Sequence, residues 1–279
     1  MAFLICGLDP GGLALLSEQV FKSREEPPMK LSDTAAVITG GASGLGEATA
    51  RYFASQGAQV TLLDRDAERG EKVAAEIGGY FVQTDVTSDE SVAKAIAHAV
   101  EKMGKITAAV NCAGIGTVGK TLGKDGPLPL STFQITVDVN LVGSFNVARL
   151  AAAEMAKNAP DADGERGVII NTASVAAFDG QKGQVPYSAS KGGIVGMTLP
   201  MARDLARDNI RVMAIAPGIF LTPMLMGLPE PAQQQLAADV PNPPRLGRPE
   251  EYGRLAGFIV EMGYLNGEVI RIDGALRMR

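Results

Sequence analysis

A glycine-rich turn between an apolar segment and a helical stretch lies near the start of the chain. Residues 35–38 read Ala-Ala-Val-Ile, residues 39–46 read Thr-Gly-Gly-Ala-Ser-Gly-Leu-Gly, and residues 47–56 have a helical pattern. A strand, a glycine turn and a helix in this order bring a diphosphate onto backbone N–H groups at the helix N-terminus, because glycine permits close approach. The stretch therefore predicts the first strand-helix unit of a dinucleotide-binding fold.

An acidic residue follows at the distance that such a fold uses to recognise the adenosine. The next predicted strand, residues 59–63, ends in Asp64, 20 residues after Gly44. A carboxylate at this place hydrogen-bonds the ribose hydroxyls and repels a 2′-phosphate. Asp64 therefore favours NAD over NADP, and the neighbouring Arg65 argues for the opposite preference.

Apolar and helical segments continue to alternate along the rest of the chain. With residues 35–38, seven strands are predicted, the others at 59–63, 80–83, 106–110, 167–171, 210–215 and 267–272. Strands that alternate with helices form a parallel sheet, and ligands bind at the carboxyl ends of its strands. The expected fold class is α/β: a Rossmann-type, doubly wound parallel sheet of about seven strands in a single domain, residues 30–279.

Residues 1–29 have a different texture. They lack the basic start and long apolar core of a secretory signal, and they contain acidic residues, which transit peptides avoid. We expect a poorly ordered N-terminal extension. Because Met29 stands directly before the first strand, a further hypothesis is that translation begins there.

Composition limits the classes of function. The formal net charge of -5 and the lack of basic runs argue against a nucleic-acid surface, and no membrane partner is expected, so a small-molecule substrate is the expected partner. The two cysteines lie far apart, which suits a reducing compartment, and we expect a cytoplasmic protein. The single histidine, His98, falls in an amphipathic helical stretch, which disfavours a Ser-His-Asp hydrolase; no metal site is expected.

A tyrosine and a lysine four positions apart are the strongest candidates for chemistry. If the segment after Pro186 is helical, Tyr187 and Lys191 lie on one face, and the ammonium can sit close to the phenol oxygen. A positive neighbour favours phenolate, so we expect Lys191 to lower the pKa of Tyr187 and make it an acid/base near neutral pH. Ser174 lies upstream, after the apolar run at 168–170.

These residues together resemble the short-chain dehydrogenase/reductase family. The resemblance rests on the glycine turn, Asn111-Cys-Ala-Gly114, Asn140, Ser174, the Tyr187/Lys191 pair and Pro217-Gly218, in an order and spacing that cover residues 30–279. The family more often has asparagine where this chain has Cys112. Apart from the resemblance, we expect Cys112 to be a small buried apolar residue and not a nucleophile.

The resemblance implies an NAD-dependent enzyme with a Ser-Tyr-Lys mechanism. The implied catalytic residues are Ser174, Tyr187, Lys191 and Asn140, with Ser174 and Tyr187 binding the substrate oxygen and Asn140 placing a water that relays the proton. The implied cofactor-binding residues are Gly40, Ser43, Gly44, Leu45, Gly46, Asp64, Asp85, Val86, Cys112, Ala113, Gly114, Tyr187, Lys191, Phe220 and Thr222.

Longer stretches carry a narrower resemblance, at residues 110–115, 167–178, 187–199, 216–220 and 266–274. In these stretches the chain looks like the short-chain 3-hydroxyacyl-CoA dehydrogenases, also called type 10 17β-hydroxysteroid dehydrogenases. This likeness implies interconversion of (S)-3-hydroxyacyl-CoA and 3-oxoacyl-CoA in fatty-acid or branched-chain acyl-CoA oxidation. Residues 220–226 and the amphipathic stretch 229–240 read as a mobile apolar lid in which Met224 and Met226 accommodate aliphatic surfaces. The same methionines are compatible with a subunit interface.

Three other functions stay open from the sequence. A hydroxysteroid dehydrogenase and an NADPH-using 3-oxoacyl reductase fit the same scaffold, and a non-catalytic NAD(H) sensor would keep the dinucleotide site. The sensor would have no need of Ser174, Tyr187 and Lys191 together. Residues 137–156 are predicted to form a long helix that contains Asn140. The resemblance also implies a homotetramer built through this Asn140 helix, the Tyr187 helix and the C-terminal strand region.

Overall fold

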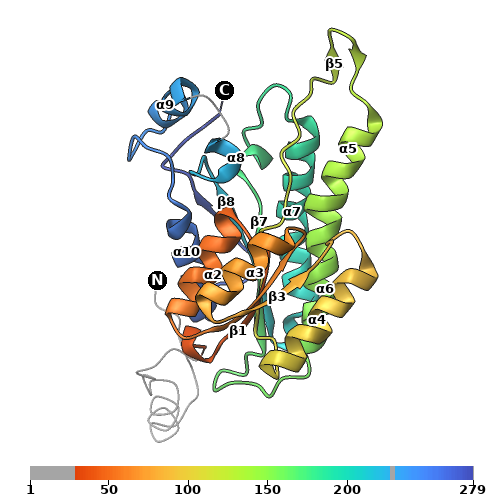
Figure 1. Ribbon diagram of the computed structural model, residues 1–279, viewed down its shortest axis with the longest axis vertical. Helices are drawn as coiled ribbons and strands as arrows, with labels where there is room; N and C mark the ends of the chain where they lie inside the picture. Colours follow the sequence, from red (N-terminus) through yellow and green to blue (C-terminus); the bar gives the residue numbers. More distant parts are fainter. Residues whose placement is uncertain (1–28, 227–229, 279) are drawn as a thin grey trace, which may run out of the picture.

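A seven-stranded parallel sheet forms the centre of the protein in a computed structural model, which describes residues 29–226 and 230–278 (Figure 1). The strand order is β3-β2-β1-β4-β7-β8-β9, which confirms the predicted doubly wound sheet. The strands are β1 (Ala35–Thr39), β2 (Gln59–Asp64), β3 (Tyr80–Gln83), β4 (Ala108–Asn111), β7 (Gly167–Thr172), β8 (Ile210–Pro217) and β9 (Val269–Ile272). Of the predicted extension, residues 1–29, all but Met29 lie outside the described residues.

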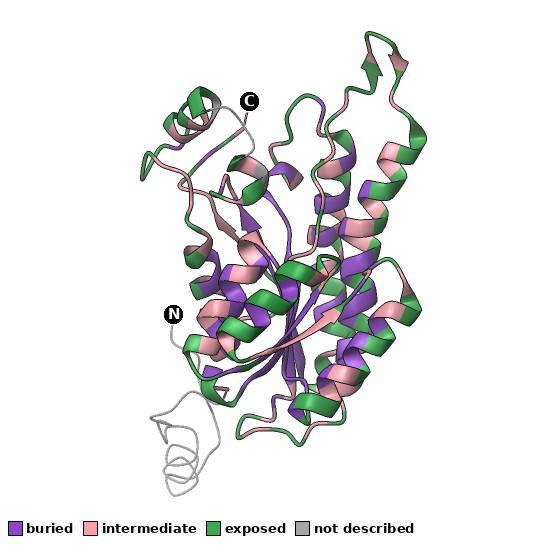
Figure 2. Ribbon diagram, viewed as in Figure 1, coloured by how far each residue is buried: buried purple, intermediate pink, exposed green. Residues whose placement is uncertain are grey.

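Helices cover both faces of the sheet. On one face lie α2 (Gly44–Ser55), α3 (Ala67–Ile77) and α10 (Pro249–Glu261), and on the other lie α4 (Asp89–Met103), α6 (Gly143–Met155) and α7 (Val185–Asp204). Side chains of one strand alternate between the two layers: Ala36 and Ile38 pack with the first group of helices, and Ala35 and Val37 with the second. Figure 2 shows the central strands buried, the edge strands β3 and β9 partly exposed, and the outer helix faces exposed.

The central strands are apolar on both faces because both faces are covered. Every residue of β1, β4, β7 and β8 is buried. The strand order reverses between β1 and β4, where β1 has β2 on one side and β4 on the other. Ligands of doubly wound sheets bind at such a reversal, beyond the carboxyl ends of the strands.

One long helical rod differs from its predicted form. The sequence predicted a helix over 137–156, and the structure has α5 (Leu130–Val137), a π-helical turn (Asp138–Val142) and α6 in direct succession. The rod therefore begins seven residues before the predicted start and is interrupted around Asn140. Single π-helical turns inside helices are frequent at functional sites.

The connections beyond the sheet complete the molecule. A small antiparallel hairpin, β5 (Leu122–Gly123) with β6 (Gly126–Pro127), projects before α5, and no strand pattern predicted it because each strand has two residues (Figure 1). The predicted lid segment contains α8 (Pro223–Met226) and α9 (Glu230–Ala238). Among residues 29–226 and 230–278, no helix is long and apolar enough to cross a membrane.

Candidate active site

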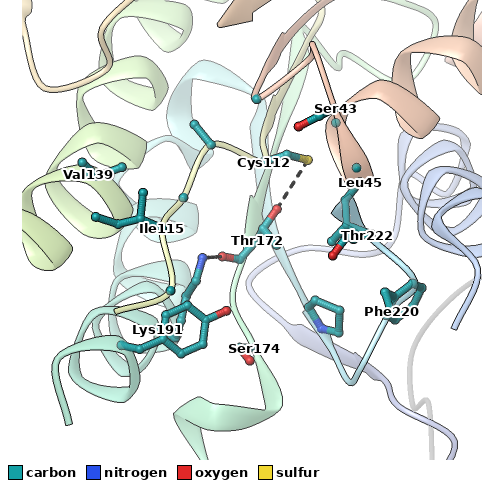
Figure 3. A pocket seen from close by; sticks show the side chains of 18 of the residues that line it. Ser43, Leu45, Cys112, Ile115, Val139, Thr172, Ser174, Lys191, Phe220 and Thr222 are labelled. Atoms are coloured by element: carbon teal, nitrogen blue, oxygen red, sulfur yellow. Dashed lines mark hydrogen bonds between the residues drawn. The ribbon is translucent and has the colours of Figure 1, made fainter. Parts of the chain in front are cut away.

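A cavity of about 680 Å³ opens at the carboxyl ends of the strands (Figure 3). It brings together segments that are far apart in the sequence. All the predicted site residues except Asn140 line it: Gly40, Ser43, Gly44, Leu45, Gly46, Asp64, Asp85, Val86, Cys112, Ala113, Gly114, Ser174, Tyr187, Lys191, Phe220 and Thr222.

Glycine is required where α2 meets β1 and β4. A Cβ atom on Gly46 would lie 2.2 Å from the carbonyl oxygen of Gly40, and one on Gly40 would lie 2.9 Å from the backbone nitrogen of Ala113. Gly40 also has a φ of +65°, in the left-handed region that favours glycine. These contacts press the N-terminus of α2 against the strand ends, so that its free N–H groups face the cavity.

Asp64 ends β2 with its carboxylate at the cavity wall. One carboxylate oxygen accepts a hydrogen bond from the backbone N–H of Ala42 at 3.0 Å, and the other accepts one from the N–H of Asp66 at 3.0 Å. The carboxylate is thereby held beside the glycine turn, and its remaining lone pairs are available to ribose hydroxyls. Arg65 also lines the cavity.

The next part of the wall follows β3. The carboxylate of Asp85 accepts hydrogen bonds from the hydroxyl and the backbone N–H of Thr87, at 2.7 and 3.0 Å, and these bonds lower its pKa. Val86 is buried, and a Cβ atom on Gly143 would lie 2.6 Å from it. An aliphatic side chain and a carboxylate thus border the cavity together with Asp64.

Ser174 and Tyr187 meet at the other end of the cavity. Ser174 follows β7, and its hydroxyl oxygen accepts a hydrogen bond from the N–H of Ala176 at 3.1 Å. Tyr187 lies in the first turn of α7, which confirms the predicted helix after Pro186. Burial raises the pKa of the Tyr187 phenol, and its hydrogen bond with Ser174 lowers it by less.

Lys191 lies one turn after Tyr187, with its ammonium 5.8 Å from the centre of the tyrosine ring. The ammonium donates a hydrogen bond to the backbone carbonyl of Thr172 at 2.7 Å (Figure 3). Burial lowers the pKa of Lys191 to about 8. The net pKa of Tyr187 is therefore raised and not lowered as expected, because loss of hydration of the phenol outweighs its hydrogen bond with Ser174.

Asn140 is buried behind the cavity wall. Its amide oxygen accepts from the N–H of Ile115 at 2.8 Å, and its amide nitrogen donates to the carbonyl of Ile115 and to the hydroxyl of Ser190, both at 3.0 Å. The side chain joins the segment after β4 to α7. The proposed placement of a water by this residue stays a prediction.

Thr172 lines the cavity and Tyr252 lies behind it, and the sequence analysis missed both. The hydroxyl of Thr172 donates to the carbonyl of Asn111 at 2.6 Å and lies 2.7 Å from the hydroxyl of Tyr252 in α10. The thiol of Cys112 lies 3.7 Å from the same tyrosine oxygen, and burial raises its pKa. Thr172 gave no signal because a strand residue has no distinctive spacing, and Tyr252 looks like an ordinary core residue of an amphipathic helix.

The described residues offer no alternative centre built on a metal. Among them, no group of three or more histidine, cysteine, aspartate or glutamate side chains could hold a metal ion. Ser174, Tyr187 and Lys191 are side chains of the cavity wall that can take part in proton transfer.

Comparison with known proteins gives the family. Residues 34–233 match the short chain dehydrogenase family. The chain belongs to the short-chain dehydrogenases. Like other members, it is a dehydrogenase that uses a nicotinamide nucleotide as its cofactor.

Individual short-chain dehydrogenases resemble the chain over nearly their whole lengths. The human 3-hydroxyacyl-CoA dehydrogenase type-2 is 58% identical over 248 residues, which are 88% of this chain and 95% of that protein. A crystal structure of 3-hydroxyacyl-CoA dehydrogenase type-2 from Mycobacterium avium is 43% identical with a TM-score of 0.86, covering 89% of this chain and 98% of that one. A 7α-hydroxysteroid dehydrogenase complexed with NADH and 7-oxo glycochenodeoxycholic acid is 29% identical with a TM-score of 0.81, covering 90% and 97%.

Proposed function

We propose that the protein oxidises (S)-3-hydroxyacyl-CoA thioesters to 3-oxoacyl-CoA with NAD as the hydride acceptor, within fatty-acid or branched-chain acyl-CoA oxidation. The observation that carries the proposal is the convergence of Ser174, Tyr187 and Lys191 with the glycine turn and Asp64 in one cavity. The names of its relatives support the choice of thioester, since the human and Mycobacterium avium proteins are 3-hydroxyacyl-CoA dehydrogenases.

The cavity fits NAD. The clash that a Cβ on Gly46 would make shows that backbone approaches backbone here, which leaves the N–H groups at the start of α2 accessible to a diphosphate. Asp64 would hold the adenosine ribose, and Asp85 and Val86 would border the adenine. Residues 112–114 and the segment with Phe220 and Thr222 would hold the nicotinamide end. When bound, NAD supplies the acceptor for the hydride that leaves the alcohol carbon.

Ser174 and Tyr187 would handle the oxygen and its proton. The substrate hydroxyl would lie between them, Ser174 would donate a hydrogen bond to the forming carbonyl oxygen, and Tyr187 as phenolate would accept the hydroxyl proton. Burial opposes the phenolate, so this step requires the positive charge of Lys191. The carbonyl of Thr172 keeps that ammonium on the cavity side of α7. Asn140 would place the water that carries the proton onward.

We also propose a homotetramer, which the apolar outer surface of the rod and α7 supports. Ile135, Val142 and Phe145 are exposed on the rod, and Val185 and Leu199 are exposed on α7. Large apolar side chains gathered on two neighbouring helices are typical of an interface. The Phe145→Glu variant should dissociate the tetramer in light scattering, and an unchanged mass would contradict this arrangement. The cytoplasmic location stays a prediction, which fractionation of expressing cells would test.

The substrate is tested by following NADH formation with (S)-3-hydroxybutyryl-CoA. Rapid turnover with NAD and slow turnover with NADP are expected. A steroid alcohol tested in parallel addresses the closest rival, which the likeness to a 7α-hydroxysteroid dehydrogenase favours. Turnover of the steroid without turnover of the thioester would reject the proposed substrate, and measurable turnover of either would reject the NAD(H) sensor. Reduction of 3-oxoacyl thioesters with NADPH alone would favour the reductase.

A further inference from the structure

The C-terminal segment turns back on itself as soon as β9 ends. Gly274 and Ala275 both have left-handed backbone conformations, with φ of +59° and +67°. The side chain of Asp273 accepts a hydrogen bond from the N–H of Ala275 at 2.9 Å, and its carbonyl accepts one from the N–H of Leu276 at 3.1 Å. Alanine is rarely found in this conformation, so these bonds hold the turn against its backbone preference.

Arg271 ties the turned segment to the chain that follows Ser174. Its guanidinium donates to the carboxylate of Asp179 at 2.7 Å and to the carbonyl of Leu276 at 3.1 Å, and it lies 5.2 Å from the centre of the Phe178 ring. It also donates to Asp273 at 2.8 Å. One side chain thus connects the strand, the turn and the segment that leads away from Ser174.

The last described residue reaches the cavity as a result. Leu276 is buried, with 3% of its surface exposed, and Met278 lines the cavity two residues later. The segment to which Arg271 ties the turn begins directly after Val175 and Ala176, which line the same cavity. Met278 therefore lies with the wall beyond Ser174, whereas Asp64 and Asp85 line the wall at the ends of β2 and β3.

We propose that Met278 is a specificity-determining residue that packs against the acyl chain of the substrate. The bonds of Arg271 to Asp179, Asp273 and Leu276, together called the Arg271 clamp, hold the segment of Met278 in place. The proposal rests on the proposed function. An unbranched thioether side chain adapts to aliphatic chains of different lengths. A short acyl group ends before this wall, and a longer one makes apolar contact with it. Each methylene that loses such contact should weaken binding about fourfold.

The full-length protein and its variants would be compared on a homologous series of 3-hydroxyacyl-CoA thioesters, from 3-hydroxybutyryl to 3-hydroxydodecanoyl. Met278→Ala and Met278→Gln should lower kcat/KM for the long thioester about fourfold or more relative to the short one, through KM. Met278→Leu should keep the ratio, and so should Met262→Ala, a matched control at an exposed methionine outside the cavity. Arg271→Met should lower the ratio although it removes only the clamp.

The same variants are measured for the KM of NAD and on a series of 2-alkanols. An unchanged chain-length ratio in Met278→Ala, or an equal rise in the KM of NAD, would overturn the inference. If the wild type oxidises the alkanols and no thioester, the proposed function fails. In that case, a change in the ratio of kcat/KM between long and short alkanols in Met278→Ala still supports the role of Met278. If the wild type oxidises neither series, both proposals are rejected.

Discussion

The ammonium of Lys191 lies 2.7 Å from the backbone carbonyl oxygen of Thr172, inside the wall of the cavity. Lys191 is 4% exposed, and its pKa is about 8 because burial disfavours the charged form. The proposed mechanism needs this ammonium charged. The protein therefore holds a cation that its own interior destabilises.

Replacing that lysine should stabilise the fold while it removes the activity. The unfolded chain has the ordinary lysine pKa of 10.5, so it binds more protons than the folded chain between pH 8 and 10.5. The penalty of the buried ammonium is full below pH 8 and disappears as the pH rises to 10.5. The free energy of unfolding of Lys191→Met should exceed that of the wild type below pH 8, and this difference should shrink by about 3 kcal/mol between pH 8 and 10.5. Chemical denaturation at several pH values measures it, and a difference independent of pH would contradict the buried charge.

Tyr187→Phe should remove turnover and leave the cofactor site intact. Loss of a general acid/base costs roughly 10²–10⁴-fold in kcat. The phenyl ring preserves the packing of α7, so NAD should bind with nearly unchanged affinity in calorimetry. Ser174→Ala is the companion variant, which should lower kcat without changing NAD binding. Near-normal turnover by Tyr187→Phe would mean that another group takes the proton.

Gly46→Ala should abolish cofactor binding and destabilise the protein by about 1–3 kcal/mol, because the new Cβ would lie 2.2 Å from the carbonyl oxygen of Gly40. Gly196→Ala is the matched control. It lies in the middle of α7 with no atom within 4 Å of the added Cβ, so it should raise stability through helix propensity. Thermal unfolding with and without NAD measures both effects, and equal behaviour of the two variants would argue against a tight glycine contact.

Asp64→Asn should weaken the preference for NAD over NADP. The amide keeps the size of the side chain but removes the charge that would repel a 2′-phosphate, and Arg65 stays in the cavity wall. We expect kcat/KM with NADP to rise about tenfold and that with NAD to fall. Steady-state kinetics with the two cofactors decides the matter. If the ratio of the two values did not move, the adenosine would have to lie elsewhere.

The sheet could be predicted from the sequence because each central strand is buried on both faces and so reads as an apolar run followed by a turn. Short strands gave weaker boundaries: β4 begins at Ala108 and β9 at Val269, two residues after each predicted start. The hairpin β5–β6 was not predictable, because two-residue strands have no periodicity. The π-helical turn was not predictable either; it contains Asn140, whose amide binds groups from other parts of the fold.

Site residues were predictable where one motif contains them. The glycine turn, the tyrosine-lysine pair and Asp64 have fixed spacings, and all of them line the cavity. The sign of the Tyr187 pKa shift was not predictable, because it depends on how deeply the phenol is buried. Thr172 and Met278, which line the cavity, and Tyr252, which binds Thr172 from α10, were missed because only the packing of the fold places them there.

Through the bond between Thr172 and Tyr252, substitutions in α10 can affect the position of Lys191. Lys191 comes from a helix on one side of the sheet and Tyr252 from a helix on the other, and both bind the same threonine. The position of the lysine is thus set jointly by helices on both sides of the sheet, through one threonine. A library of changes in α10, remote from any reactant, should therefore contain variants that fold normally but turn over slowly.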